Sequence, residues 1–243
     1  MPRRFAITGV VFSLAFDVVL CLGLGAILAT VAVPIASAQV SDDVVKIGVL
    51  TDMSGPASDA TGPGSVAAAQ MAIEDFGGQV LGKPIELVSA NHQDKPDIGA
   101  TIARTWYDVD KVDLILDVPV SAVGLAVQAV SREKQKLLIV HGTGTADFTG
   151  KFCTPYSMQW VFNTFALATG TAREVVKRGG DSWFFLTADY VFGHALEHDV
   201  AAVVLENGGK VLGKARFPWP ATSSPASTGA GSTPRTVSFM FRA

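Results

Sequence analysis

Short apolar runs alternate with amphipathic stretches of about a dozen residues between Val44 and Ala215. The first run, 44–50, is apolar at nearly every position around one lysine, which is typical of a strand buried on both faces. Strands that alternate with helices of this length form βαβ units, and right-handed crossovers place those helices on both faces of a parallel sheet. The pattern therefore predicts an α/β fold with three layers.

The element boundaries follow from apolar periodicity and from glycine pairs that end helices. The pattern pauses between His141 and Asn163, which predicts a first lobe over 39–155 and a partial second lobe over 156–216. Ser121 is predicted as the N-cap of its helix. Strands are predicted at 44–50, 85–90, 114–118, 137–140, 182–186 and 210–215, and helices at 65–76, 96–107, 121–134, 165–178 and 192–206.

The N-terminus reads as an export signal over residues 1–38. Arg3 and Arg4 form a short basic region, an apolar stretch follows, and the stretch ends in a small-x-small triplet that closes at Ala38. We expect cleavage after Ala38 and delivery to the periplasm. A membrane anchor is the alternative, because the stretch is long enough to cross a bilayer. The arginine pair leaves Sec and twin-arginine export both open.

Charge and cysteine content narrow the function classes. The net charge is −3 with both signs mixed, so neither nucleic acid nor an anionic membrane surface is predicted as a partner. Cleavage would leave Cys153 as the single cysteine, which excludes an intrachain disulfide. We interpret Cys153 as a buried small apolar residue; an orphan with a partner elsewhere is the alternative.

The C-terminal stretch, 217–243, is rich in Ala, Ser, Thr, Pro and Gly and has no Asp or Glu. Its composition predicts a low-complexity tail, either a flexible linker or the product of a broken reading frame.

Four loops follow the predicted strands at the edge where open parallel sheets bind ligands. Each offers hydroxyl groups, or backbone N–H groups next to glycine, at or near a helix N-terminus, and such groups suit a carboxylate. Capping and turn formation are the alternative for each serine or threonine taken singly. The loops are 52–64, 119–122, 141–147 and 187–193.

Several segments carry a family resemblance. Residues 46–56 (KIGVLTDMSGP), 91–97 (NHQDKPD), 142–145 (GTGT) and 188–193 (ADYVFG) resemble, in the same order, the branched-chain amino acid type of ABC-transporter solute-binding protein. The resemblance runs from about Val44 to Arg216. It implies a type I periplasmic-binding-protein fold, in which two αβα lobes form a clamshell that closes on a solute.

The resemblance also implies a site and partners. The expected partners are a small amino-acid-like, amide or aromatic carboxylate solute and the membrane permease of an ABC importer; the protein is expected to be monomeric, without cofactor, metal or enzymatic activity. Family members continue well beyond this chain's last residue, so the resemblance also implies a C-terminal truncation that leaves the second lobe incomplete. The expected ligand-binding residues are Ser121, Ala122, Thr143 and Thr145 for the carboxylate or amide, Tyr190 as an aromatic cap, and Ser54 at the entrance.

Other functions are alternatives to solute binding for import. A sensory binding module for a signalling receptor would use the same cleft, and a non-functional truncated product would explain the tail. A Rossmann-like enzyme would need a catalytic constellation, and no nucleophile elbow or phosphate loop occurs. His194-Ala195-Leu196-Glu197-His198 matches an inverted zinc-protease pattern, but catalytic zinc needs a third protein ligand, and a solvated helix face explains the spacing. Trp106 and Trp183 are interpreted as packing residues.

Overall fold

The computed structural model describes residues 42–219 and the backbone of 239–240. The predicted signal, 1–38, lies outside the described residues, as does most of the predicted tail. Within the described part of the chain, no helix combines the length and apolarity needed to cross a membrane.

The first sheet has six strands in the order β2-β3-β1-β4-β5-β6. Five of them run parallel, and β2 joins the edge as an antiparallel strand through β3. The predicted parallel α/β arrangement is thereby confirmed. The bounds are β1 Val45–Thr51, β2 Gln79–Val80, β3 Lys83–Asn91, β4 Leu114–Asp117, β5 Leu137–Val140 and β6 Ser157–Gln159.

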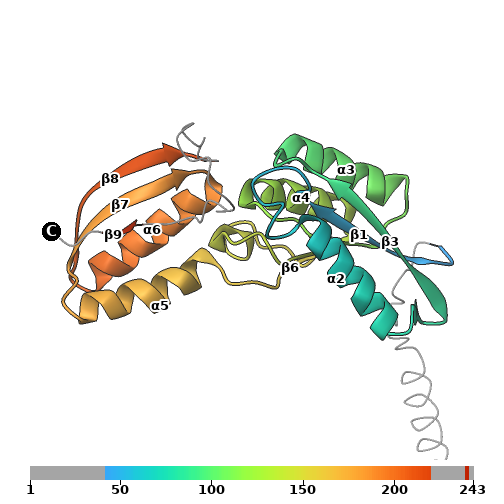
Figure 1. Ribbon diagram of the computed structural model, residues 1–243, viewed down its shortest axis with the longest axis horizontal. Coiled ribbons are helices and arrows are strands. Elements are labelled where there is room, and N and C mark those ends of the chain that lie inside the picture. The colour runs from blue at the N-terminus through green and yellow to red at the C-terminus, as the bar shows by residue number, and fades with distance from the viewer. Residues whose placement is uncertain (1–41, 220–238, 241–243) are drawn as a thin grey trace, which may run out of the picture. The chain divides into compact units, whose positions relative to one another are not determined.

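Helices cover both faces of this sheet, as the crossover rule predicts (Figure 1). α3 (Pro96–Asp108) and α4 (Ser121–Lys134) pack together over one face, where their apolar side chains meet those of the strands. α2 (Gly62–Asp75) lies on the other face, beside Val49 and Leu116.

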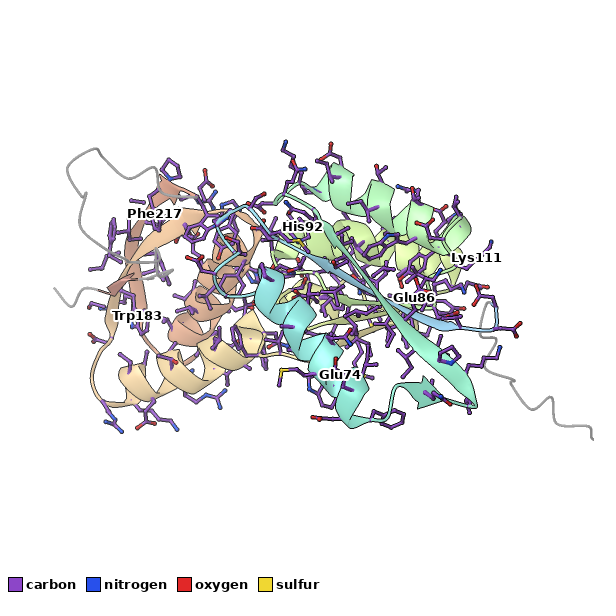
Figure 2. All side chains as sticks on the ribbon, turned by 45° about the vertical axis from the view of Figure 1, so that its right-hand side comes forward. Glu74, Glu86, His92, Lys111, Trp183 and Phe217 are labelled. Atoms are coloured by element: carbon purple, nitrogen blue, oxygen red, sulfur yellow. The ribbon has the colours of Figure 1, made fainter. Side chains whose placement is uncertain are left out.

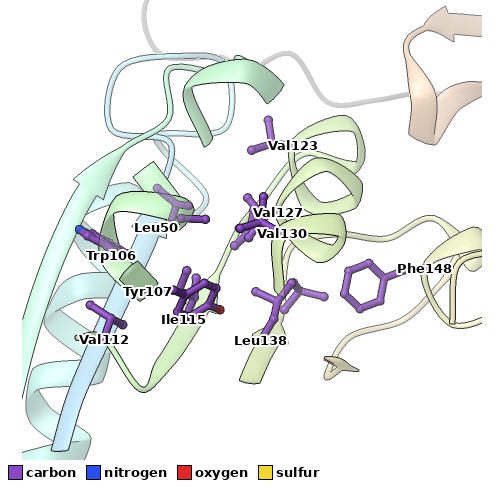
Figure 3. Packing of buried hydrophobic residues seen from close by; sticks show 13 residues of the cluster. Leu50, Trp106, Tyr107, Val112, Ile115, Val123, Val127, Val130, Leu138 and Phe148 are labelled. Atoms are coloured by element: carbon purple, nitrogen blue, oxygen red, sulfur yellow. The ribbon is translucent and has the colours of Figure 1, made fainter. Parts of the chain in front are cut away.

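The main core lies between the first sheet and the α3–α4 pair (Figure 3). Leu50, Ile115 and Leu138 from the strands face Trp106 of α3 and Val127 of α4. Each fully buried aliphatic side chain contributes roughly 1.5–3 kcal/mol through lost apolar surface. This core fixes the strand ends from which the site loops leave the sheet.

The second sheet has the order β8-β7-β9, with β8 parallel and β9 antiparallel to β7. Ala172 of α5, Trp183 of β7 and Val204 of α6 belong to one buried cluster. Burial of Trp183 and of Trp106 confirms that both are packing residues. The bounds are α5 Thr164–Lys177, β7 Ser182–Asp189, α6 Val191–Glu206, β8 Lys210–Pro218 and β9 Phe239–Met240.

The structure corrects two expectations and adds two details at the predicted domain bounds. Cys153 is exposed rather than buried, because it lies in the turns that precede β6 and not in an apolar element. Ser121 is the first residue of α4 and not its N-cap, which is Val120. β6 adds to the first sheet although it lies beyond residue 155, and β8 continues through Pro218 into the predicted tail.

Candidate functional site

The loop after β1 is built around the carboxylate of Asp52. This fully buried group accepts hydrogen bonds from the backbone N–H of Ser54 at 3.3 Å, Gly55 at 2.7 Å and Ala57 at 3.0 Å. A Cβ on Gly55 would lie 2.5 Å from Asp52 Oδ2, so the loop closes this tightly only around a glycine. One side chain therefore holds the first loop at the carboxyl end of the sheet.

The loop after β4 contains a run of residues with a left-handed backbone. Asp117, Val118 and Val120 have φ values of 80°, 48° and 70°. β-branched residues rarely adopt this conformation, and such strain concentrates at functional sites where the surrounding structure enforces it. Here the backbone N–H of Val118 donates to Leu50 O at 2.9 Å, and Thr143 Oγ1 donates to Val118 O at 2.6 Å. The strained loop is thus fixed by β1 on one side and by the loop after β5 on the other.

His141 joins the loop after β5 to the loop after β4. Its backbone N–H donates to the carbonyl of Asp117 at 3.2 Å, and its Nδ1 lies 3.3 Å from Asp117 Oδ1. A Cβ on Gly142 would lie 2.7 Å from the Cα of Pro119, so the two loops approach as closely as backbone allows.

Asp117 is fully buried, and Nδ1 of His141 lies 3.3 Å from its Oδ1. Burial raises the pKa of Asp117 because the charged form loses hydration, while the hydroxyls of Thr51 and Ser65 and the ring of His141 oppose that rise. Asp117 is therefore a buried acid whose nearest base is His141.

His92 follows β3 at the carboxyl end of the sheet, whereas Lys111 lies at the opposite end (Figure 2). The ring of His92 is fully buried, and its Nδ1 accepts a hydrogen bond from the backbone N–H of Asp94 at 3.1 Å. Burial lowers the pKa of His92 to about 4, against a smaller opposing effect of Asp52. The ring is neutral at pH 7, and its hydrogen bond holds the backbone of the loop at Asp94.

The loops at this edge line a cavity of about 650 Å³, within the range of small-molecule sites. Apolar and aromatic side chains dominate its lining, and the polar lining groups are hydroxyls, loop backbone and one imidazole. The lining residues are Pro56, Ala57, Ala60, Thr61, Pro119, Val120, Ser121, His141, Gly142, Gly144, Val161, Phe162, Leu167, Tyr190, Phe192, Leu196 and Trp219.

Tyr190 belongs to an aromatic group at the start of α6. Its ring stacks on Trp219 with centroids 5.2 Å apart and an interplanar angle of 19°. The ring of Phe192 is tilted against that of Tyr190, and the centroids of these two rings lie 6.0 Å apart. A Cβ on Gly144 would lie 2.7 Å from the ring of Phe192, so the loop after β5 also contacts this group. Three aromatic rings therefore form one wall of the cavity.

Two of the six residues expected at the site line the cavity: Ser121 and Tyr190. Thr143 and Thr145 are fully buried behind it; the backbone N–H of Thr145 donates to Ser121 Oγ at 3.2 Å, and Thr145 Oγ1 accepts from the backbone of Asp147 at 3.3 Å.

The other two expected residues also lie apart from the lining. Ala122 is part of the first turn of α4. Ser54 is exposed, and its Oγ accepts from Asn91 Nδ2 at 2.8 Å.

Sequence reasoning missed most of the apolar lining. Phe162 and Leu167 come from the segment where the strand–helix pattern pauses, and Trp219 lies in the predicted tail. His141 was within a predicted binding loop, and its position directly after a strand was the available signal.

The histidines of the zinc-protease-like pattern have other partners. His194 Nε2 lies 2.7 Å from Asp189 Oδ1, and His198 Nδ1 lies 3.3 Å from Asp199 Oδ1. Glu197 accepts from Lys214 Nζ at 3.0 Å. Among the residues with described side chains, no three His, Cys, Asp or Glu are grouped as metal ligands.

The chain is similar to solved structures of binding proteins. A periplasmic binding protein from Burkholderia mallei is 51% identical, with a TM-score of 0.72, over 74% of this chain and 48% of that one. A branched-chain amino acid ABC transporter periplasmic ligand-binding protein from Burkholderia xenovorans LB400 is 36% identical, with a TM-score of 0.64, over the same shares.

A more distant structure shares the fold. It is a solute-binding protein of an ABC transporter from Rhodopseudomonas palustris BisB5 in complex with 3,4-dihydroxybenzoic acid, 22% identical, with a TM-score of 0.66, covering 73% of this chain and 48% of that one. The chain thus spans about half the length of these relatives. A search of curated proteins found no match.

A family model described as a periplasmic binding protein matches residues 44–230, beyond Arg216, where the resemblance seen in the sequence ends. That match covers most of the chain and agrees with the topology, the cavity and the 51% identity to the Burkholderia mallei protein. The chain belongs to the periplasmic binding protein family.

Proposed function

We propose that this protein is the periplasmic solute-binding component of an ABC importer and that it captures a small organic solute reversibly, without making or breaking a bond. The observation that carries the proposal is the cavity of about 650 Å³ at the carboxyl ends of the strands. Its apolar walls suit an organic body, and its few hydroxyl and backbone groups suit one polar headgroup. The membrane permease of the importer is the proposed partner.

Ser121 and Tyr190 are proposed to contact the solute directly, because both line the cavity. Thr143 and Thr145 support it from behind: Thr143 Oγ1 anchors the β4 loop through Val118 O, and the backbone of Thr145 anchors Ser121 Oγ. Ala122 contributes the first turn of α4, whose N-terminal backbone suits an anionic group. Ser54 remains proposed as an entrance residue.

The solute class is proposed as amino-acid-like, amide or aromatic carboxylate. The relative from Burkholderia xenovorans is described as a branched-chain amino acid transporter protein. A structure with the same fold holds 3,4-dihydroxybenzoic acid. Both descriptions apply to those proteins, and they suggest which compounds to test on this chain.

Isothermal titration calorimetry of the full chain tests the proposal. The panel consists of leucine, isoleucine, valine, benzoate, 3,4-dihydroxybenzoate and the carboxamides of these compounds. Saturable binding of one class with a stoichiometry near one would support a solute-binding protein. A folded protein that releases no binding heat with any member, at several temperatures, would contradict the proposal for this panel. Turnover of a bound compound, followed by chromatography, would contradict the statement that no bond is changed.

A further inference from the structure

Few of the side chains that line the cavity can carry a charge. Among its lining residues there is no aspartate, glutamate, lysine or arginine, and the titratable ones are His141 and Tyr190. A tyrosine is neutral near pH 7, whereas a histidine changes charge close to that pH. His141 is therefore the one cavity-lining side chain in the described structure that can carry a positive charge.

The ring of His141 is oriented by Asp117. Nδ1 lies 3.3 Å from the carboxylate of Asp117, which is fully buried and is not among the lining residues. A carboxylate beside one ring nitrogen fixes the orientation of the imidazole. The backbone hydrogen bond from His141 to Asp117 holds the two residues together independently of their charge.

This arrangement distinguishes between solutes. With Nδ1 turned to Asp117, Nε2 is the ring nitrogen left for a solute, and a protonated ring offers it as an N–H donor. A solute carboxylate gains a charge-assisted hydrogen bond from such a donor, and a neutral amide gains a weaker one. A solute ammonium group would meet a cation and no lining carboxylate.

We propose that His141, positioned by Asp117, recognises the negative charge of the solute, so that the physiological ligand is a carboxylate and not its amide. This inference rests on the proposed function and makes it more specific. It assigns a solute-contacting role to His141 and a positioning role to Asp117.

The test measures affinities for matched acid–amide pairs by calorimetry, with benzoate and benzamide, 3,4-dihydroxybenzoate and its amide, and isovalerate and isovaleramide. The native chain should bind one acid at least tenfold more tightly than its amide. His141→Gln should lose that preference, with affinity for the acid falling at least tenfold and affinity for the amide changing less than threefold. His194→Gln is the matched control, because His194 also pairs with a carboxylate, Asp189, but does not line the cavity.

The positioning role has its own test. Asp117→Asn should reduce the acid preference and shift the ring-nitrogen NMR signals of His141, a change that simple loosening of the loop would not confine to one histidine. If this buried substitution unfolds the protein, His141→Gln still decides the inference. Binding of solutes with equal affinity for acid and amide, or an unchanged preference in His141→Gln, would overturn the inference and leave the proposed function standing. No binding by any pair would overturn both.

Discussion

Nδ1 of His141 lies 3.3 Å from Oδ1 of Asp117, and the backbone N–H of His141 donates to the carbonyl of the same aspartate. Side chain and main chain therefore join the loops after β4 and β5 at one point. Asp117 also begins the left-handed run that shapes the first of these loops, with φ of 80°. The strained loop and the imidazole at the cavity are consequently parts of one arrangement.

The carboxylate of Asp52 should be the main stabiliser of the first loop. Replacing Asp52 with alanine removes the acceptor of three backbone hydrogen bonds, and we expect a loss of about 2–4 kcal/mol in the free energy of unfolding. Asp59→Ala, an exposed substitution in the same loop, should change it by less than about 0.5 kcal/mol. Urea denaturation measures both. Equal stability of the two variants would show that the loop does not depend on Asp52.

The turn between β7 and α6 should not accept a side chain at Gly193. A Cβ there would lie 2.1 Å from the carbonyl oxygen of Ala188, so Gly193→Ala should destabilise the protein by about 1–3 kcal/mol and disturb Tyr190. Gly170→Ala is the control: no atom lies within 4 Å of its ideal Cβ, and alanine favours the interior of α5 by up to about 1 kcal/mol. Relative to the native chain, the melting temperature should fall for Gly193→Ala and rise for Gly170→Ala. A melting temperature for Gly193→Ala at or above that of the native chain would contradict the geometry.

The ring of Tyr190 should contribute directly to solute affinity. Tyr190→Ala removes a ring from the aromatic wall that it shares with Trp219, and we expect about a tenfold loss for whichever panel member binds. Phe76→Ala, which removes an exposed ring outside the cavity lining, should leave the affinity unchanged. Calorimetric titration compares them. If both variants bind equally well, Tyr190 is not part of the site.

Acid should destabilise the fold through His92. The pKa of His92 in the folded protein, about 4, lies below the ordinary value of 6.5. Between these two pH values the unfolded state therefore binds a proton that the native state does not bind. The neutral ring's contribution is complete above pH 6.5 and declines as the pH falls to about 4, by up to about 3 kcal/mol.

His92→Gln should flatten this slope, because the variant lacks the ring that takes up the proton on unfolding. Asp94 and Asp117, whose pKa values are raised, are present in both chains, so their contributions cancel in the difference between them. His198→Gln, at an exposed position, should retain the slope. Denaturation curves at half-unit pH steps measure it. A native chain with constant stability between pH 6.5 and 4 would contradict a buried neutral His92.

Apolar periodicity was sufficient to predict the first lobe. The helix over 121–134 and the strand over 137–140 are found at those bounds, since their apolar spacing is regular and their ends carry no competing signal. β2 and β6 were missed because strands of two and three residues are too short to show a period. The burial of Cys153 was predicted wrongly, because residue type alone does not indicate whether a turn is exposed to solvent.

The site was less predictable from sequence than the fold. The carboxyl-end rule located the loops, and Ser121 and Tyr190 proved to line the cavity. The rule does not tell which way a side chain turns, so Thr143, whose hydroxyl donates to Val118 O, could not be distinguished from a lining residue. The pairing of His141 with Asp117 depends on contact between loops 24 positions apart and became visible only in three dimensions.

The most direct test of the central claim is a thermal melt of the full chain, alone and with each member of the acid and amide panel. A ligand that binds only the native state stabilises it by about 2.7 kcal/mol at a hundredfold excess over its dissociation constant, which shifts the melting temperature by several degrees. A cooperative melt that one carboxylate moves upward, and its amide moves less, is the predicted result. A cooperative melt that no solute moves would contradict the claim that this cavity binds a small organic solute.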